Sequence, residues 1–119
     1  MKQQLLISSF VFIGGGIGAL FRFLASSSFS QLKLASWQAT LLVNALGTLF
    51  YFLSLKINNS HNDFSQYFLR FGLFGALTTF STLSFEVANA FKQGQMLEGI
   101  LIFSLNIFTG ILIAVGIFR

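Results

Sequence analysis

The stretch GLFGALTTFSTLSFE, from Gly72 to Glu86, decides how this chain can fold. It is apolar enough to lie inside a membrane, yet it carries two glycines and five hydroxyl residues, namely Thr78, Thr79, Ser81, Thr82 and Ser84. In hydrocarbon, a polar group without a hydrogen-bond partner costs several kcal/mol. We therefore expect these side chains to face protein, water or an ion rather than lipid.

The composition is that of a membrane protein. Of 119 residues, 55% are hydrophobic, 17 are Phe and only 8% are charged, so a soluble domain of this size would lack a polar surface. The length allows a single domain, residues 1–119. The net charge of +4 is scattered along the chain, which favours contact with anionic lipid headgroups over nucleic acid.

Candidate catalytic or metal-binding groups are few. The sequence contains no Cys, which excludes disulfides and thiolate metal sites. The only histidine, His61, has no second His nearby, and we interpret it as a solvated loop residue rather than a ligand. No nucleophile–base pair is visible, so the sequence does not predict an enzyme.

Charged residues bound the expected membrane spans. The uncharged intervals are residues 3–21, 34–55, 71–85 and 99–118, which contain 19, 22, 15 and 20 residues. A helix needs roughly 20 residues to cross about 30 Å of hydrocarbon, so the third interval is too short. Either Arg70 and Glu86 snorkel to the surface, or this segment is not one continuous helix.

We predict an all-α membrane protein with four transmembrane helices, at about residues 4–25, 36–56, 67–91 and 97–118. The third helix is expected to be broken at mid-membrane, and residues 26–36 are expected to form a polar connection. Four spans put both termini on one side. The basic residues divide four against three, as Lys2, Lys56, Arg70 and Arg119 on one side and Arg22, Lys33 and Lys92 on the other. This weak bias permits both orientations and makes an antiparallel dimer possible.

The first span is rich in glycine. Gly14 and Gly18 have the spacing that lets two helix backbones approach closely, so we interpret them as a packing face. Arg22 follows one turn later. It is either an anchor at the membrane interface or a residue that draws anions toward a vestibule.

Uncharged polar groups recur near the centres of three spans. Asn44 shares one helix face with Thr40, Thr48 and Tyr51, and Asn106 lies near the centre of the last span. No titratable group lies at the centre of any span, which argues against proton-coupled transport. Amide and hydroxyl donors, with the ring edge of Phe80 among the hydroxyl residues, suit passive passage of a small anion.

The chain resembles the Fluc family of fluoride channels, also called CrcB. The matching pieces are GGGIGALFR (Gly14 to Arg22), NALG (Asn44 to Gly47) and the opening stretch, and they occur in order across three spans. The resemblance implies passive export of fluoride across the cell membrane by a dual-topology homodimer with two antiparallel pores.

The resemblance also assigns roles to residues. It implies a vestibule role for Arg22, and a structural, non-transported sodium ion bound by the main-chain carbonyls of Gly75 and Thr78. The residues expected to line the pore are Asn44, Phe80, Ser81, Thr82, Leu83 and Asn106.

Three positions depart from the family pattern. Leu83 stands where the family usually has a second phenylalanine, Ile102 where it has a tyrosine, and Asn106 where it has a serine. One alternative is therefore a non-conducting or degenerate-pore partner in a heterodimeric channel. Another is a transporter of the small multidrug resistance type, although that family needs a Glu in the first span and none lies between Gln3 and Phe21.

Overall fold

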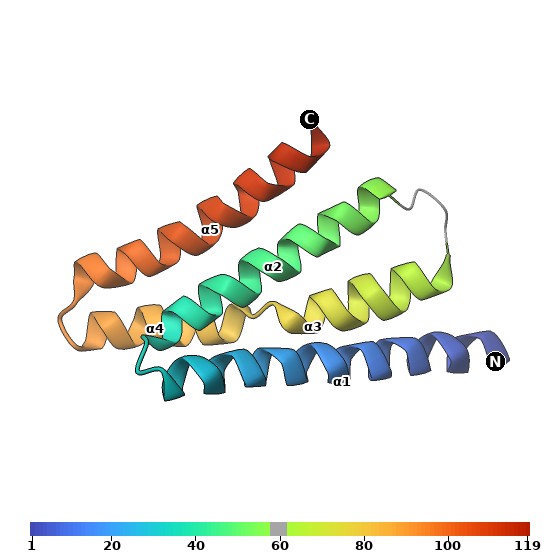
Figure 1. The fold of residues 1–119 in the computed structure, drawn as a ribbon, viewed down its shortest axis with the longest axis horizontal. Helices are drawn as coiled ribbons and strands as arrows, with labels where there is room; N and C mark the ends of the chain where they lie inside the picture. Colours follow the sequence, from blue (N-terminus) through green and yellow to red (C-terminus); the bar gives the residue numbers. More distant parts are fainter. Residues whose placement is uncertain (58–61) are drawn as a thin grey trace.

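The computed structural model describes residues 1–57 and 62–119, so His61 lies outside the described residues. Four apolar helical segments are each long enough to cross a membrane, namely Lys2–Gln31, Ser36–Ile57, Phe64–Lys92 and Met96–Phe118. The first two are α1 and α2, and the last is α5 (Figure 1). The prediction of a helical protein with four membrane-spanning segments is confirmed.

The first helix is longer than predicted. α1 continues through the serines that we expected to form a polar connection, and it ends at Gln31. No glycine or proline interrupts these residues, and serine is only mildly unfavourable within a helix. The helix closes where Lys33 adopts a positive φ of 56° and the Leu34 N–H bonds the Phe29 carbonyl at 3.0 Å. The connection to α2 is therefore only residues 32–35.

The third segment has three parts. η1 (Phe64–Phe74) is a wide π-helix, α3 (Gly75–Leu77) is a single short turn, and α4 (Phe80–Lys92) completes the segment. Between α3 and α4 the chain is extended, with φ −73° and ψ 154° at Thr78 and φ −147° and ψ 122° at Thr79. The segment is thus two helices in line rather than one (Figure 1).

Glycines let α1 lie directly on the third segment. Gly14 and Gly18 are both buried, and a Cβ atom at either position would overlap a carbonyl oxygen, that of Phe68 or Leu73. From the other side, a Cβ on Gly72 would lie 2.9 Å from the Gly14 Cα. The predicted packing face of the first span is confirmed, and it fixes where the interruption after Leu77 lies along α1.

The bundle is open along one side. Among the described residues, α5 packs on α2 and α4 but not on α1 or η1, so α2 is the central helix (Figure 1).

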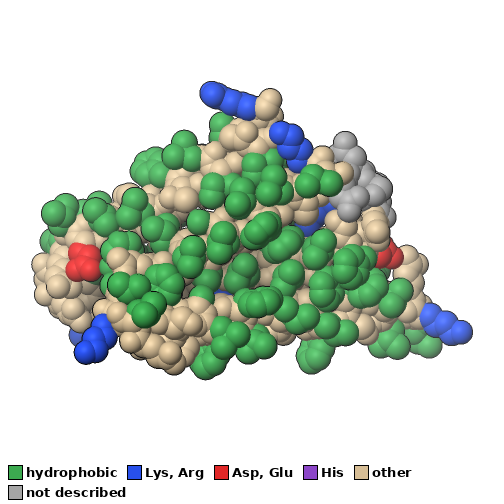
Figure 2. All heavy atoms as spheres, viewed as in Figure 1, with side chains coloured by type: hydrophobic (Ala, Val, Ile, Leu, Met, Phe, Trp, Pro, Cys, Tyr) green, Lys and Arg blue, Asp and Glu red, His purple; other side chains and the backbone are tan. Residues whose placement is uncertain are grey.

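Figure 2 shows hydrophobic side chains over the middle of one face, with most of the charged side chains near its edges. This distribution fits a molecule surrounded by lipid at its middle and by water at its ends.

Substitution of Gly14 tests the packing of α1. Gly14→Ala is expected to lower thermal stability in detergent, by roughly 1 to 3 kcal/mol, because the added methyl group would meet backbone atoms that cannot move aside. Gly16→Ala is the matched control, since a Cβ there meets nothing within 4 Å. Equal melting temperatures for the two variants would contradict this account of the packing.

Candidate functional site

The extended backbone at Thr79 is held by one side chain. The Thr79 N–H donates to Asn44 Oδ1 at 2.7 Å, and Asn44 Nδ2 donates to the Thr79 carbonyl at 3.2 Å. The side-chain amide therefore replaces the backbone hydrogen bonds that are lost where the helix stops. In an apolar environment this replacement is what makes the interruption tolerable.

Asn44 also connects this point to α5. Its Nδ2 donates to Asn106 Oδ1 at 2.8 Å, and Asn106 Nδ2 donates to the Ile102 carbonyl at 3.0 Å. Because the Thr79 N–H can only donate, the Asn44 oxygen must face it and the Asn44 nitrogen must face Asn106. Both amide hydrogens of Asn44 are therefore already used.

The hydroxyl residues after Thr79 cap the next helix. Thr79 Oγ1 accepts from the Thr82 N–H at 3.2 Å, as an N-cap residue does, and lies 3.0 Å from Thr82 Oγ1. Ser81 Oγ lies 3.4 Å from the same Thr79 oxygen. Two of the predicted pore residues, Ser81 and Thr82, thus belong to the start of α4 and interact with Thr79.

An open pocket of about 250 Å³ adjoins these groups, and we call it the asparagine pocket. It contains four of the six predicted pore residues, and its lining is Asn44, Thr48, Thr78, Thr79, Phe80, Leu83, Asn106 and Ile107. Phe80 is 75% exposed, whereas Leu83 is only 4% exposed. Arg22 is not among the residues that line this pocket.

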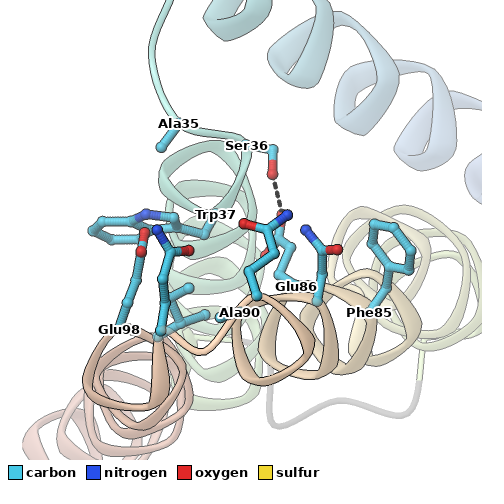
Figure 3. Close-up of a pocket in the computed structure, with 11 residues that line it drawn as sticks. Ala35, Ser36, Trp37, Phe85, Glu86, Ala90 and Glu98 are labelled. Carbon is cyan, nitrogen blue, oxygen red and sulfur yellow. Dashed lines mark hydrogen bonds between the residues drawn. The ribbon is translucent and has the colours of Figure 1, made fainter.

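A carboxylate for which the sequence left snorkelling to the surface open is buried. Glu86 is only 6% exposed, and its Oε1 accepts hydrogen bonds from Ser36 Oγ at 3.0 Å and Thr40 Oγ1 at 2.8 Å (Figure 3). Of the two alternatives for the short third interval, the structure therefore has the interrupted helix, and Glu86 does not snorkel because two hydroxyl groups of α2 bind it inside the protein. The sequence contained one indication that Glu86 is buried. Its spacing from Leu83 and Thr79 is helical, so the three residues share one face, and this face of α4 and its N-cap is buried.

Glu86 lines a second pocket, of about 190 Å³, which we call the glutamate pocket (Figure 3). Its lining comes from the start of α2, the second half of α4 and the start of α5, and consists of Ala35, Ser36, Trp37, Phe85, Glu86, Asn89, Ala90, Gln93, Gln95, Glu98 and Ile102. Within the described part of the chain, Glu86 Oε2 is buried and has no hydrogen-bond partner. This pocket was not predicted.

The main-chain carbonyls of Gly75 and Thr78, which the resemblance implies as sodium ligands, have lost the N–H donors that they would have in a continuous helix. In a continuous helix the Thr79 N–H would bond the Gly75 carbonyl and the Thr82 N–H would bond the Thr78 carbonyl. Here those two N–H groups donate to Asn44 and to Thr79 Oγ1 instead. Gly75 O still accepts from Thr78 Oγ1, at 3.1 Å. Main-chain oxygens freed in this way are suitable ligands for a hard cation.

Comparison with known proteins identifies the family. Residues 9–117 match the family described as "CrcB-like protein, Camphor Resistance (CrcB)". The chain belongs to this family. The sequence resemblance is thereby confirmed, and it goes against the alternative of a small multidrug resistance-type transporter.

Several similar proteins are called fluoride-specific ion channel FluC. The one from Clostridium novyi (strain NT) is 34% identical over 109 residues, which cover 88% of this chain and 85% of that protein. The one from Idiomarina loihiensis is 38% identical over 112 residues, covering 90% of this chain and 85% of that protein. A third, from Shewanella denitrificans, is 39% identical over 101 residues and 82% of each chain. These names describe channels and not enzymes, in agreement with the sequence analysis. With its four membrane-capable helices, this member of the CrcB family is a multi-pass membrane protein.

Replacing Asn44 tests whether its amide holds the interruption. Asn44→Leu keeps the branched shape and the number of side-chain heavy atoms but removes three hydrogen bonds, so we expect a loss of roughly 1 to 3 kcal/mol in thermal stability in detergent. Thr48→Val is the matched control. It also removes a polar group from the asparagine pocket, but the Thr48 hydroxyl group has no hydrogen bond to any of the described residues. If both variants melt at the temperature of the unmodified protein, Asn44 does not have this role.

Proposed function

We propose that this protein is a fluoride-specific channel that lets fluoride leave the cell passively and so limits its toxicity. The observation that carries the proposal is the family membership, with relatives named as fluoride-specific channels over most of their length. The asparagine pocket supports it, since Asn44, Thr48 and Asn106 give it a neutral hydrogen-bonding lining. Such a lining suits an ion that crosses without a coupled proton.

The hydrogen bonds of the pocket indicate which groups face the ion. Asn44, Thr78 and Thr79 all use their donors within the protein. The Thr48 hydroxyl and the second N–H of Asn106 remain as donors, and the exposed ring of Phe80 offers its positive edge. In this proposal Asn44 shapes the pore, while Thr48, Asn106 and Phe80 contact fluoride.

We further propose that two copies assemble as an antiparallel dimer. The asparagine pocket is open, Phe80 is 75% exposed, and the hydroxyl residues Ser81 and Ser84 lie on the surface of a membrane-spanning segment. Facing lipid, the Ser84 hydroxyl group would lose its hydrogen bonds to water without replacement, and Ser81 would keep only its 3.4 Å contact with Thr79 Oγ1. A second copy against this surface covers them, and the near balance of basic residues between the two sides is compatible with opposite orientations.

A sodium ion between the two copies follows from the same arrangement. The carbonyls of Gly75 and Thr78 lost their helical donors, and they lie at an interruption that we place at mid-membrane. Each copy would offer the Gly75 and Thr78 carbonyls, so two copies together would supply four oxygens. In this role sodium is structural and is not transported.

A flux measurement on the protein alone tests the proposed function. Liposomes containing the purified protein are expected to release fluoride and to retain chloride, as recorded with ion-selective electrodes. The same measurement separates a self-sufficient channel from the degenerate-pore partner of a heterodimer, which would release no fluoride without its partner. Fluoride release no faster than from protein-free liposomes would overturn the proposal.

Removal of sodium tests the structural ion. Replacing sodium by a large organic cation at constant ionic strength is expected to lower the melting temperature of the dimer in detergent, because the freed carbonyls lose their ligand. Potassium replacement provides the size control. An identical melting temperature in all three solutions would contradict a sodium site.

A further inference from the structure

The two pockets lie at successive levels of the same three helices. On α2, Thr40 bonds Glu86 in the glutamate pocket, and Asn44, one turn later, lines the asparagine pocket. On α5, Ile102 lines the first pocket and Asn106 the second. Four helical residues correspond to about 6 Å, so the pockets are about one turn apart on both helices.

A buried apolar side chain lies at each of these two levels. Leu83 of α4 lines the asparagine pocket and is 4% exposed, and Ile102 of α5 lines the glutamate pocket and is 2% exposed. α4 and α5 pack on each other, and the two pockets have no lining residue in common. On α4 the buried Leu83 is thus one turn from Glu86, and on α5 the buried Ile102 is one turn from Asn106.

We propose that Leu83 and Ile102 form an apolar constriction between the glutamate pocket and the asparagine pocket, and that crossing it limits the rate of fluoride passage. This inference rests on the proposed function. Fluoride is small and strongly hydrated, so it crosses only where water or protein donors replace the donors it leaves. Two aliphatic side chains offer none, and hydrophobic constrictions resist wetting.

A hydroxyl group placed in the constriction tests the proposal. Ile102→Thr and Ile102→Val differ by one hydroxyl group at almost the same volume, so their comparison removes the effect of shortening Ile. In liposomes, Ile102→Thr is expected to release fluoride about threefold faster or more than Ile102→Val, while chloride stays inside. Leu83→Thr and Leu83→Val repeat the comparison from α4, so one pair remains informative if the other does not fold.

Flux through the unmodified protein is recorded in the same experiment, which separates the two proposals. If it conducts fluoride and the Thr variants are no faster than the Val variants, the constriction is wrong and the channel function stands. If it does not conduct but a Thr variant does, the constriction is supported and self-sufficient conduction is wrong. Release of chloride as fast as fluoride from the Thr variants would also overturn the constriction, since it would indicate a general leak.

Discussion

The Asn44 amide takes the place of a backbone partner for Thr79. A helix that stops inside an apolar segment leaves N–H and C=O groups unpaired, and hydrocarbon provides no water to satisfy them. Asn44 satisfies both polar groups of Thr79, and Thr79 in turn caps α4 through its hydroxyl group. The freed Gly75 and Thr78 carbonyls, the asparagine pocket and the link to α5 all follow from this arrangement.

The position of the interruption depends on a second constraint, the close approach of α1. With glycine at positions 14, 18 and 72, the backbones of α1 and the third segment touch directly. Larger side chains would separate the two and leave the third segment free to shift along α1. Because interiors are closely packed, a shift of this kind would also move Thr79 away from Asn44.

Much of this architecture could be predicted from the sequence. Charged residues marked four spans, the shortness of the third suggested an interruption, and Gly14 and Gly18 indicated a packing face. Asn44 and Asn106 were each singled out by their polarity. Their direct contact was not predicted, because helical periodicity gives the face of a residue but not the neighbour that this face meets.

Glu86 and the length of α1 show where such reasoning stops. The charge at the end of the short interval left snorkelling and an interrupted helix as alternatives, and nothing in the sequence showed that two hydroxyl groups 46 and 50 positions away hold Glu86 inside the protein. Whether a carboxylate turns inward depends on such partners, which a local pattern does not contain. The serines at the end of α1 were likewise interpreted from polarity alone, although nothing in their backbone preferences ends a helix there.

The occupied donors of Asn44 bear on how an anion is selected. An amide whose hydrogens are both bonded to protein gains nothing by turning to an ion, because it would leave the Thr79 carbonyl and the Asn106 oxygen unpaired. A rigid Asn44 does, however, keep Asn106 in one orientation and so directs its second N–H. In the channel proposed above, selectivity would then come from a few donors held at fixed positions, which a small anion reaches at short distance and a larger one does not.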